Sequence, residues 1–189
     1  MRMLSCFAVA ALLVAGSIVA AAELKSGLQP GEAIGAFDVV KCAGAEKDGV
    51  DLGDQLCYRC KYGARPMVIV FARHADAHLG MLAKRLDKVV AKHADQQLSA
   101  FINILGEDRD AAEAAAKEFA AAQGVENLPV VVPVEFTNGP ADYGINPEAE
   151  VTIILAKNSK VVANHAFAAA DLNEEALKAV AADMPKLLQ

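Results

Sequence analysis

Two cysteines separated by two residues, Cys57 and Cys60, form a C-x-x-C pair. Such a pair can cycle between dithiol and disulfide, bind a metal, attach haem or close a structural bridge. Arg59 and Lys61 flank Cys60, and positive charge beside a thiol favours the reactive thiolate. One hypothesis is therefore a redox centre, in which one cysteine attacks the disulfide of a partner and the other resolves the mixed disulfide.

A third cysteine, Cys42, leaves the pairing open. In the redox hypothesis Cys42 is a candidate third, resolving thiol. In the structural alternative Cys57 and Cys60 form a permanent bridge, or Cys42 is bridged to one of them and ties the region of the pair to an earlier strand. The spacing does not distinguish these pairings.

Two histidines raise the alternative of a metal site. Thirteen residues separate Cys60 from His74, and His78 follows after three more, which is within the spacing of two-Cys two-His zinc sites. The intervening apolar run, 66–72, would span about 20 Å as a strand, which separates the cysteines from the histidines. Zinc or copper binding by these four residues is therefore a minor hypothesis, and we assign no metal ligand.

Haem attachment is a further alternative for the pair. The usual attachment motif is C-x-x-C-H, and here Lys61 takes the place of the histidine. We therefore predict no cofactor.

The first 22 residues predict export. They contain Arg2, then an uninterrupted apolar run, then the small residues Ala20, Ala21 and Ala22, which is the pattern of a cleaved secretory signal peptide. Cleavage would remove Cys6 and leave a domain over 23–189 with a net charge of −7. The expected location is periplasmic or extracellular, where disulfides persist.

This acidic balance argues against a nucleic-acid partner, and no second apolar run is long enough to span a membrane. The expected partners are other exported proteins, met through thiol–disulfide exchange or surface binding.

The remaining sequence predicts alternating strands and helices around the cysteines. Continuous apolar runs of strand length indicate buried strands, and apolar residues at three- and four-residue spacing indicate helices. We expect strands at 36–42, 50–52, 66–72, 98–105, 128–136, 151–156 and 160–167. We expect helices at 76–93 and 108–123, with Asp108 as N-cap and Gly124 as stop, and a last helix opened by a capping box of Asp171 and Glu174.

This order predicts an α/β fold. It consists of a central mixed β-sheet with helices on both faces and an N-terminal β-hairpin extension. The cysteine pair falls in an irregular stretch between the hairpin and the first long strand.

The segments "QPGEAIGAFDVV", "KDGVDL" and "ARPMVIVFA" resemble the thioredoxin-like superfamily, in particular its redoxin branch of peroxiredoxins and TlpA-type proteins. The resemblance covers roughly 29–188 and implies a thioredoxin-like fold. In that family the reactive cysteines follow the first long strand, where this chain has "ARHADAH" (72–78) and no cysteine. The family's proline before the closing hairpin is also missing, at 150–152. The C-x-x-C stands instead in an apparent insertion before the strand.

Two functions from different classes follow. The first is an exported redoxin-type thiol–disulfide oxidoreductase that uses the relocated pair Cys57 and Cys60. The second is a non-catalytic thioredoxin-like binding module with structural cysteines. The missing cysteine after the strand favours the second function.

Overall fold

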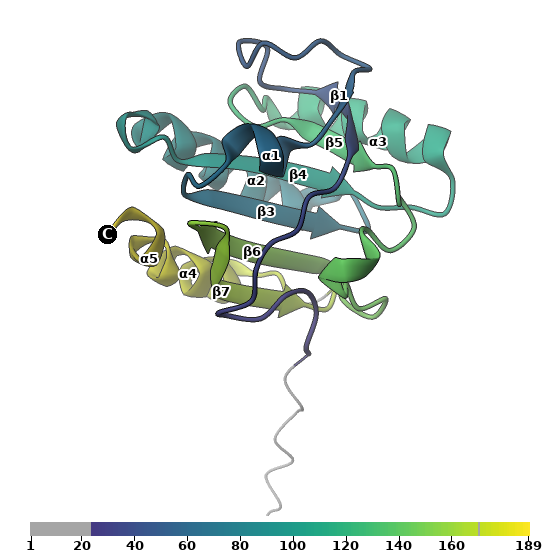
Figure 1. Ribbon diagram of the computed structural model, residues 1–189. Helices are drawn as coiled ribbons and strands as arrows, with labels where there is room; N and C mark the ends of the chain where they lie inside the picture. Colours follow the sequence, from purple (N-terminus) through teal and green to yellow (C-terminus); the bar gives the residue numbers. More distant parts are fainter. Residues whose placement is uncertain (1–23, 170) are drawn as a thin grey trace, which may run out of the picture.

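The computed structural model describes residues 24–169 and 171–189 (Figure 1). The signal peptide predicted for residues 1–22 lies outside these residues. Seven strands form one sheet in the order β2-β1-β5-β4-β3-β6-β7. The strands are β1 (Val39–Ala43), β2 (Gln55–Leu56), β3 (Met67–Ala72), β4 (Ser99–Ile104), β5 (Val130–Pro133), β6 (Val151–Lys157) and β7 (Lys160–Phe167). The helices are α1 (Tyr58–Tyr62), α2 (Ala77–Lys92), α3 (Arg109–Gln123), α4 (Glu174–Asp183) and α5 (Pro185–Leu188), with short 3-10 turns η1 (Ala94–Gln96) and η2 (Ala141–Tyr143).

The sheet is mixed, as predicted. Strands β3, β4 and β5 are parallel, while β6 and β7 on one side and β1 and β2 on the other pair antiparallel. Every residue of β3 is buried, which explains why this strand is a continuous apolar run rather than an alternating one.

Helices α2 and α3 begin and end where their capping residues stand. The side chain of Asp76 accepts a hydrogen bond from the Leu79 amide (2.9 Å), and Asp108 accepts one from the Ala111 amide (2.9 Å). Gly124 ends α3 in the left-handed conformation, which glycine adopts without steric cost. The sequence expectations for both helices are confirmed to within a residue.

Helices lie on both faces of the sheet, as predicted, but the two faces are covered differently. The apolar sides of α2, α3, α4 and α5 share one hydrophobic core with the same face of the sheet. The other face is covered by the short helix α1, the extended N-terminal segment and the loop that contains η2 (Figure 1). The crossovers β3-α2-β4 and β4-α3-β5 advance in the same direction across the sheet, so their common right-handedness places both helices on one face.

Three local expectations are wrong. The returning strand of the N-terminal hairpin is β2, Gln55–Leu56, rather than 50–52. The cysteine pair lies at a short helix, α1, rather than in an irregular stretch. The cap of the last helix is Asn173, whose side chain accepts hydrogen bonds from two amides of the first turn, instead of Asp171, and Pro185 then divides that helix into α4 and α5.

Within the described residues, no helix is both long and apolar enough to cross a bilayer.

Candidate functional site at the Cys57–Cys60 disulfide

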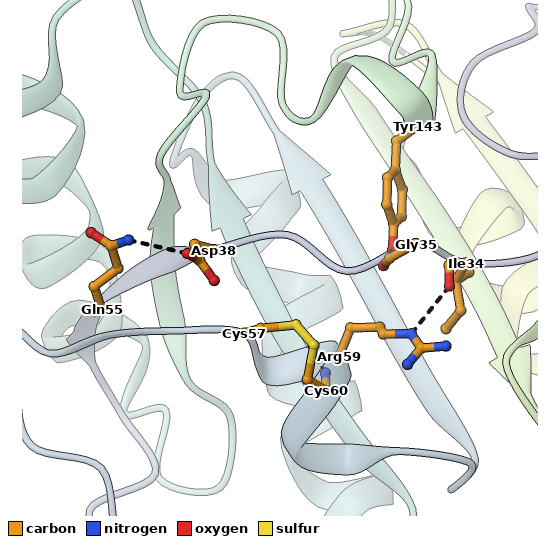
Figure 2. Close-up of a disulfide and its surroundings, with 8 residues drawn as sticks. All are labelled: Ile34, Gly35, Asp38, Gln55, Cys57, Arg59, Cys60 and Tyr143. Carbon is orange, nitrogen blue, oxygen red and sulfur yellow. Dashed lines mark hydrogen bonds between the residues drawn. A yellow bond between two sulfur atoms is a disulfide. The ribbon is translucent and has the colours of Figure 1, made fainter.

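Cys57 and Cys60 are joined by a disulfide at the start of α1, with their Cα atoms 5.2 Å apart (Figure 2). Cys57 is the N-cap residue of this helix, and its Sγ accepts a hydrogen bond from the Cys60 amide at 3.0 Å. Cys60 is exposed and Cys57 is half-buried. The bridge therefore closes a single helical turn, and one of its sulfur-bearing residues faces solvent.

Two tyrosines hold α1 against the sheet. Tyr58 and Tyr62 are four residues apart, so they lie on the same side of the helix, and both are buried. Their ring centroids lie 5.5 Å from each other, and 5.7 Å and 6.1 Å from that of Phe101 in β4. Because this side of the helix faces inward, Cys60 and Lys61 are directed to the outside.

Beneath the disulfide, Tyr58 belongs to a buried polar network. Its hydroxyl donates to Oδ2 of Asp48 (2.6 Å), and the Lys41 ammonium donates to Oδ1 of Asp48 (2.8 Å). Lys41 is only 1 % exposed, and its two other hydrogen bonds go to the carbonyls of Ala45 (3.0 Å) and Val50 (2.8 Å). All three ammonium protons are thus satisfied, as a buried charge requires.

Burial and hydrogen bonding act in opposite directions on the pKa of Asp48. Burial alone would raise it, but hydrogen bonds from Lys41, Tyr58 and the Val50 amide together hold the pKa below its usual value. Burial and the adjacent Asp48 carboxylate raise the pKa of Tyr58, so Tyr58 remains a neutral donor. This network was not predicted from the sequence. The signal for it is Lys41, which stands two residues after Val39 and therefore on the same, inward side of the strand.

The extended segment 34–38 runs beside the disulfide (Figure 2). Nε of Arg59 donates to the Ile34 carbonyl (3.1 Å), and the Tyr143 hydroxyl donates to the Gly35 carbonyl (2.8 Å). In the antiparallel β1–β2 pairing Val39 stands opposite Leu56. Continuing this register by one residue along each strand brings Asp38 opposite Cys57. Segment 34–38 therefore forms one wall of the site.

Cys42 lies away from the pair. It belongs to the hydrophobic core between the sheet and α2–α5, whereas Tyr58 and Tyr62 of α1 pack on the opposite face of the sheet. Cys42 is 2 % exposed, and burial, followed by the nearby Glu113 carboxylate, raises its thiol pKa to about 11. The structure therefore brings Cys57 and Cys60 together and leaves Cys42 as a free, buried thiol.

The two histidines also lie apart from the cysteines, after the far end of β3. His74 shares a hydrogen bond through Nδ1 with Oε1 of Glu150 (2.7 Å), and His78 Nδ1 lies 3.0 Å from the Leu172 carbonyl. Across residues 24–169 and 171–189, no group of three or more His, Cys, Asp or Glu side chains is placed to hold a metal.

The stretch 72–78 after β3, where the family resemblance implies the reactive cysteines, contains an arginine, Arg73. The Arg73 guanidinium donates to the carbonyls of Ala149 (3.2 Å), Thr137 (3.1 Å) and Asn146 (3.3 Å), and to Oδ1 of Asn138 (3.1 Å). This place therefore holds a structural clamp on the loop between β5 and β6.

Comparison with solved structures defines the fold. A putative thiol:disulfide interchange protein DsbE from Chlorobium tepidum is 17 % identical, with 86 % of this chain and 99 % of that chain covered and a TM-score of 0.62. A putative protein disulfide isomerase from Bacteroides thetaiotaomicron is 15 % identical over 86 % and 92 %, with a TM-score of 0.60. Peroxidoxin BcpB from Mycobacterium tuberculosis is 14 % identical over 82 % and 97 %, with a TM-score of 0.55.

No protein-family model matches the sequence, and no curated protein is similar to it. Likeness at these identities shows the fold alone. The chain has a thioredoxin-like fold whose structural neighbours are redoxins of the TlpA/DsbE and peroxiredoxin types, as the resemblance implied. It carries a C-x-x-C disulfide near the start of that fold.

Proposed function

We propose that this protein is an exported thiol–disulfide oxidoreductase in which Cys57 and Cys60 form the redox centre. The observation that carries the proposal is an accessible disulfide that joins no distant parts of the chain. In the chain-entropy description, a loop of four residues stabilises a fold by only about 2 kcal/mol, less than bridges that close long loops. A bridge in this position adds little as a staple, and its exposed Cys60 is open to exchange.

The exchange step follows from the different surroundings of the two sulfurs. A thiolate of a reduced partner dithiol attacks Sγ of Cys60, the Cys57–Cys60 bond breaks, and Cys57 leaves as a thiolate. The Cys60 amide, 3.0 Å from Sγ of Cys57, stabilises that charge. The second partner thiol then attacks the mixed disulfide and releases Cys60. The partner loses two electrons and forms a disulfide, while Cys57 and Cys60 gain two electrons and two protons.

Export supports this chemistry. A signal peptide at residues 1–22 would deliver the protein to a compartment where disulfides form and persist. Its partners there would be other exported proteins with exchangeable thiols.

A non-catalytic binding module is the second candidate. Its support is the absence of a cysteine from the stretch 72–78, where the family resemblance implies the reactive cysteines. Arg73 in that stretch clamps the loop between β5 and β6 instead. In this function the Cys57–Cys60 bridge only rigidifies α1, and the surface of the fold binds another protein.

The reduction potential of the pair distinguishes these functions. Equilibration with glutathione or dithiothreitol buffers, followed by thiol trapping and mass mapping, should give a value between about −120 and −270 mV for an exchanging pair. A value below about −300 mV would identify a structural bridge and overturn the proposal. The Cys42→Ala variant should keep the wild-type potential, and the Cys57→Ser/Cys60→Ser variant should lose all oxidation of a reduced protein substrate.

A further inference from the structure

Two adjoining cavities form a groove beside the redox site. One has a volume of about 300 Å³ and the other about 430 Å³, and four residues line both: Val134, Glu135, Pro140 and Ala141. The groove runs between the end of β5 and the turn η2. Val134 is 42 % exposed in it, one of the two large apolar side chains that the described part of the chain leaves in solvent.

One end of this groove lies at the segment that runs beside the disulfide. Residues Ala36, Phe37 and Asp38 line the smaller cavity, and they belong to the segment that walls the site in Figure 2. The Val39–Leu56 pairing places Asp38 beside Cys57.

The backbone beside this end is open to a ligand. Within the described residues, the backbone groups of Ala36 and Phe37 make no hydrogen bond, although the segment is extended. Extended backbone with unpaired donors and acceptors is what an added strand requires.

The charges that line the groove are all negative. They are the carboxylates of Asp38, Glu135 and Asp142, and all three residues are exposed. One oxygen of Glu135 accepts the Ala141 amide at 3.0 Å, which fixes its carboxylate at the rim. Two guanidinium groups bond to lining residues without lining the groove themselves. Arg109 donates to the Val134 carbonyl and lies 4.8 Å over the Phe136 ring, and Arg73 donates to the Thr137 carbonyl and to Oδ1 of Asn138.

From these features we infer that the groove binds an extended segment of a partner protein that carries a lysine or arginine close to its cysteine. The segment would pair with the backbone at 36–37 and pack on Val134. Its basic side chain would lie among Glu135 and Asp142, while its cysteine meets Cys60. This inference rests on the proposed function in naming a cysteine substrate, but the groove and its charge preference are tested separately from redox activity.

The test is equilibrium binding of two labelled extended peptides to the oxidised protein, measured by fluorescence anisotropy at low salt. Both peptides carry serine in place of cysteine, so no exchange occurs. One has lysines at alternate positions and the other has glutamates. The lysine peptide should bind about 5-fold more tightly or better, and added salt should reduce the difference.

Two matched variants test the location. The Glu135→Gln/Asp142→Asn variant is isosteric and should weaken lysine-peptide binding about 5-fold. The Glu118→Gln/Asp95→Asn variant removes the same charge from exposed positions on α3 and η1, outside the groove, and should bind as the wild type does. Equal binding of the two peptides, or equal weakening in both variants, would overturn the inference.

The two proposals fail in different ways. Lysine-peptide binding that depends on Glu135 and Asp142, together with a potential below about −300 mV, would retain the groove and refute the oxidoreductase. A potential in the exchanging range without selective peptide binding would retain the oxidoreductase and refute the groove.

Discussion

Replacing Asp48 by asparagine should destabilise the protein strongly, although the substitution changes almost no volume. Asp48 is the counter-ion of Lys41, whose side chain is 1 % exposed, and it also accepts the Tyr58 hydroxyl. In Asp48→Asn the Lys41 ammonium keeps two carbonyl acceptors but loses its negative partner. Removal of one member of a buried ion pair costs about 3–5 kcal/mol.

The carbonyls of Ala45 and Val50 remain as acceptors for the Lys41 ammonium in this variant. We therefore expect a loss at the lower end of that range, about 3 kcal/mol.

The assay is urea unfolding at pH 7, with stability taken from the midpoint at an unchanged slope. The exposed control Asp95→Asn should change the free energy of unfolding by less than about 0.5 kcal/mol. The double variant Lys41→Met/Asp48→Asn should recover part of the loss, because it no longer buries an unpaired charge. A loss below about 1 kcal/mol in Asp48→Asn would refute the reasoning, since Lys41 would then not depend on its counter-ion.

Three further outcomes follow from the same contacts. Because the native pKa of Asp48 is lowered, its contribution to stability is present above the unfolded pKa of about 3.9 and is lost as the pH falls through the native pKa. The free energy of unfolding should therefore fall less steeply with acid in Asp48→Asn than in wild type. Equal acid profiles of the two proteins would contradict this. Arg73→Ala should cost about 2–3 kcal/mol and speed amide exchange across 137–150, which lose their clamp, whereas unchanged exchange there would show that the clamp is dispensable. Thiol counting without reductant, on protein lacking residues 1–22, should find no reactive thiol in the native protein at pH 8 and one thiol, Cys42, in the unfolded protein. Three thiols in the unfolded protein would refute the Cys57–Cys60 bridge.

Local signals in the sequence predicted the long elements well. The caps Asp108 and Gly124 mark the ends of α3 because their chemistry acts on adjacent amides and carbonyls. The continuous apolar run 66–72 predicted β3 because a strand covered on both faces needs no polar side. The C-x-x-C spacing allowed a bridge between Cys57 and Cys60 but left Cys42 as an alternative partner, and the structure selects the pair whose Cα atoms lie 5.2 Å apart on one helical turn.

Two other signals were misleading. The segment 50–52 looks like a strand by composition, but the Val50 carbonyl accepts from the Lys41 ammonium and the paired strand is β2. Asp171 and Glu174 resemble a capping box, yet Asn173 caps α4 through the amides of Glu175 and Ala176. The first error came from a contact between separate segments, and the second from two adjacent candidates for the same local cap.

The sequence by itself determined the α/β order and the ends of α2 and α3, because these depend on residues close together in the chain. Only the tertiary structure decided that Cys42 lies on the other face of the sheet from α1 and that Arg73 clamps the loop between β5 and β6. These relations depend on strand order and on the hand of the crossovers, which assign each residue to a face and an end of the sheet. The same packing brings segment 36–38 and residues 134–145 together into the groove beside Cys57.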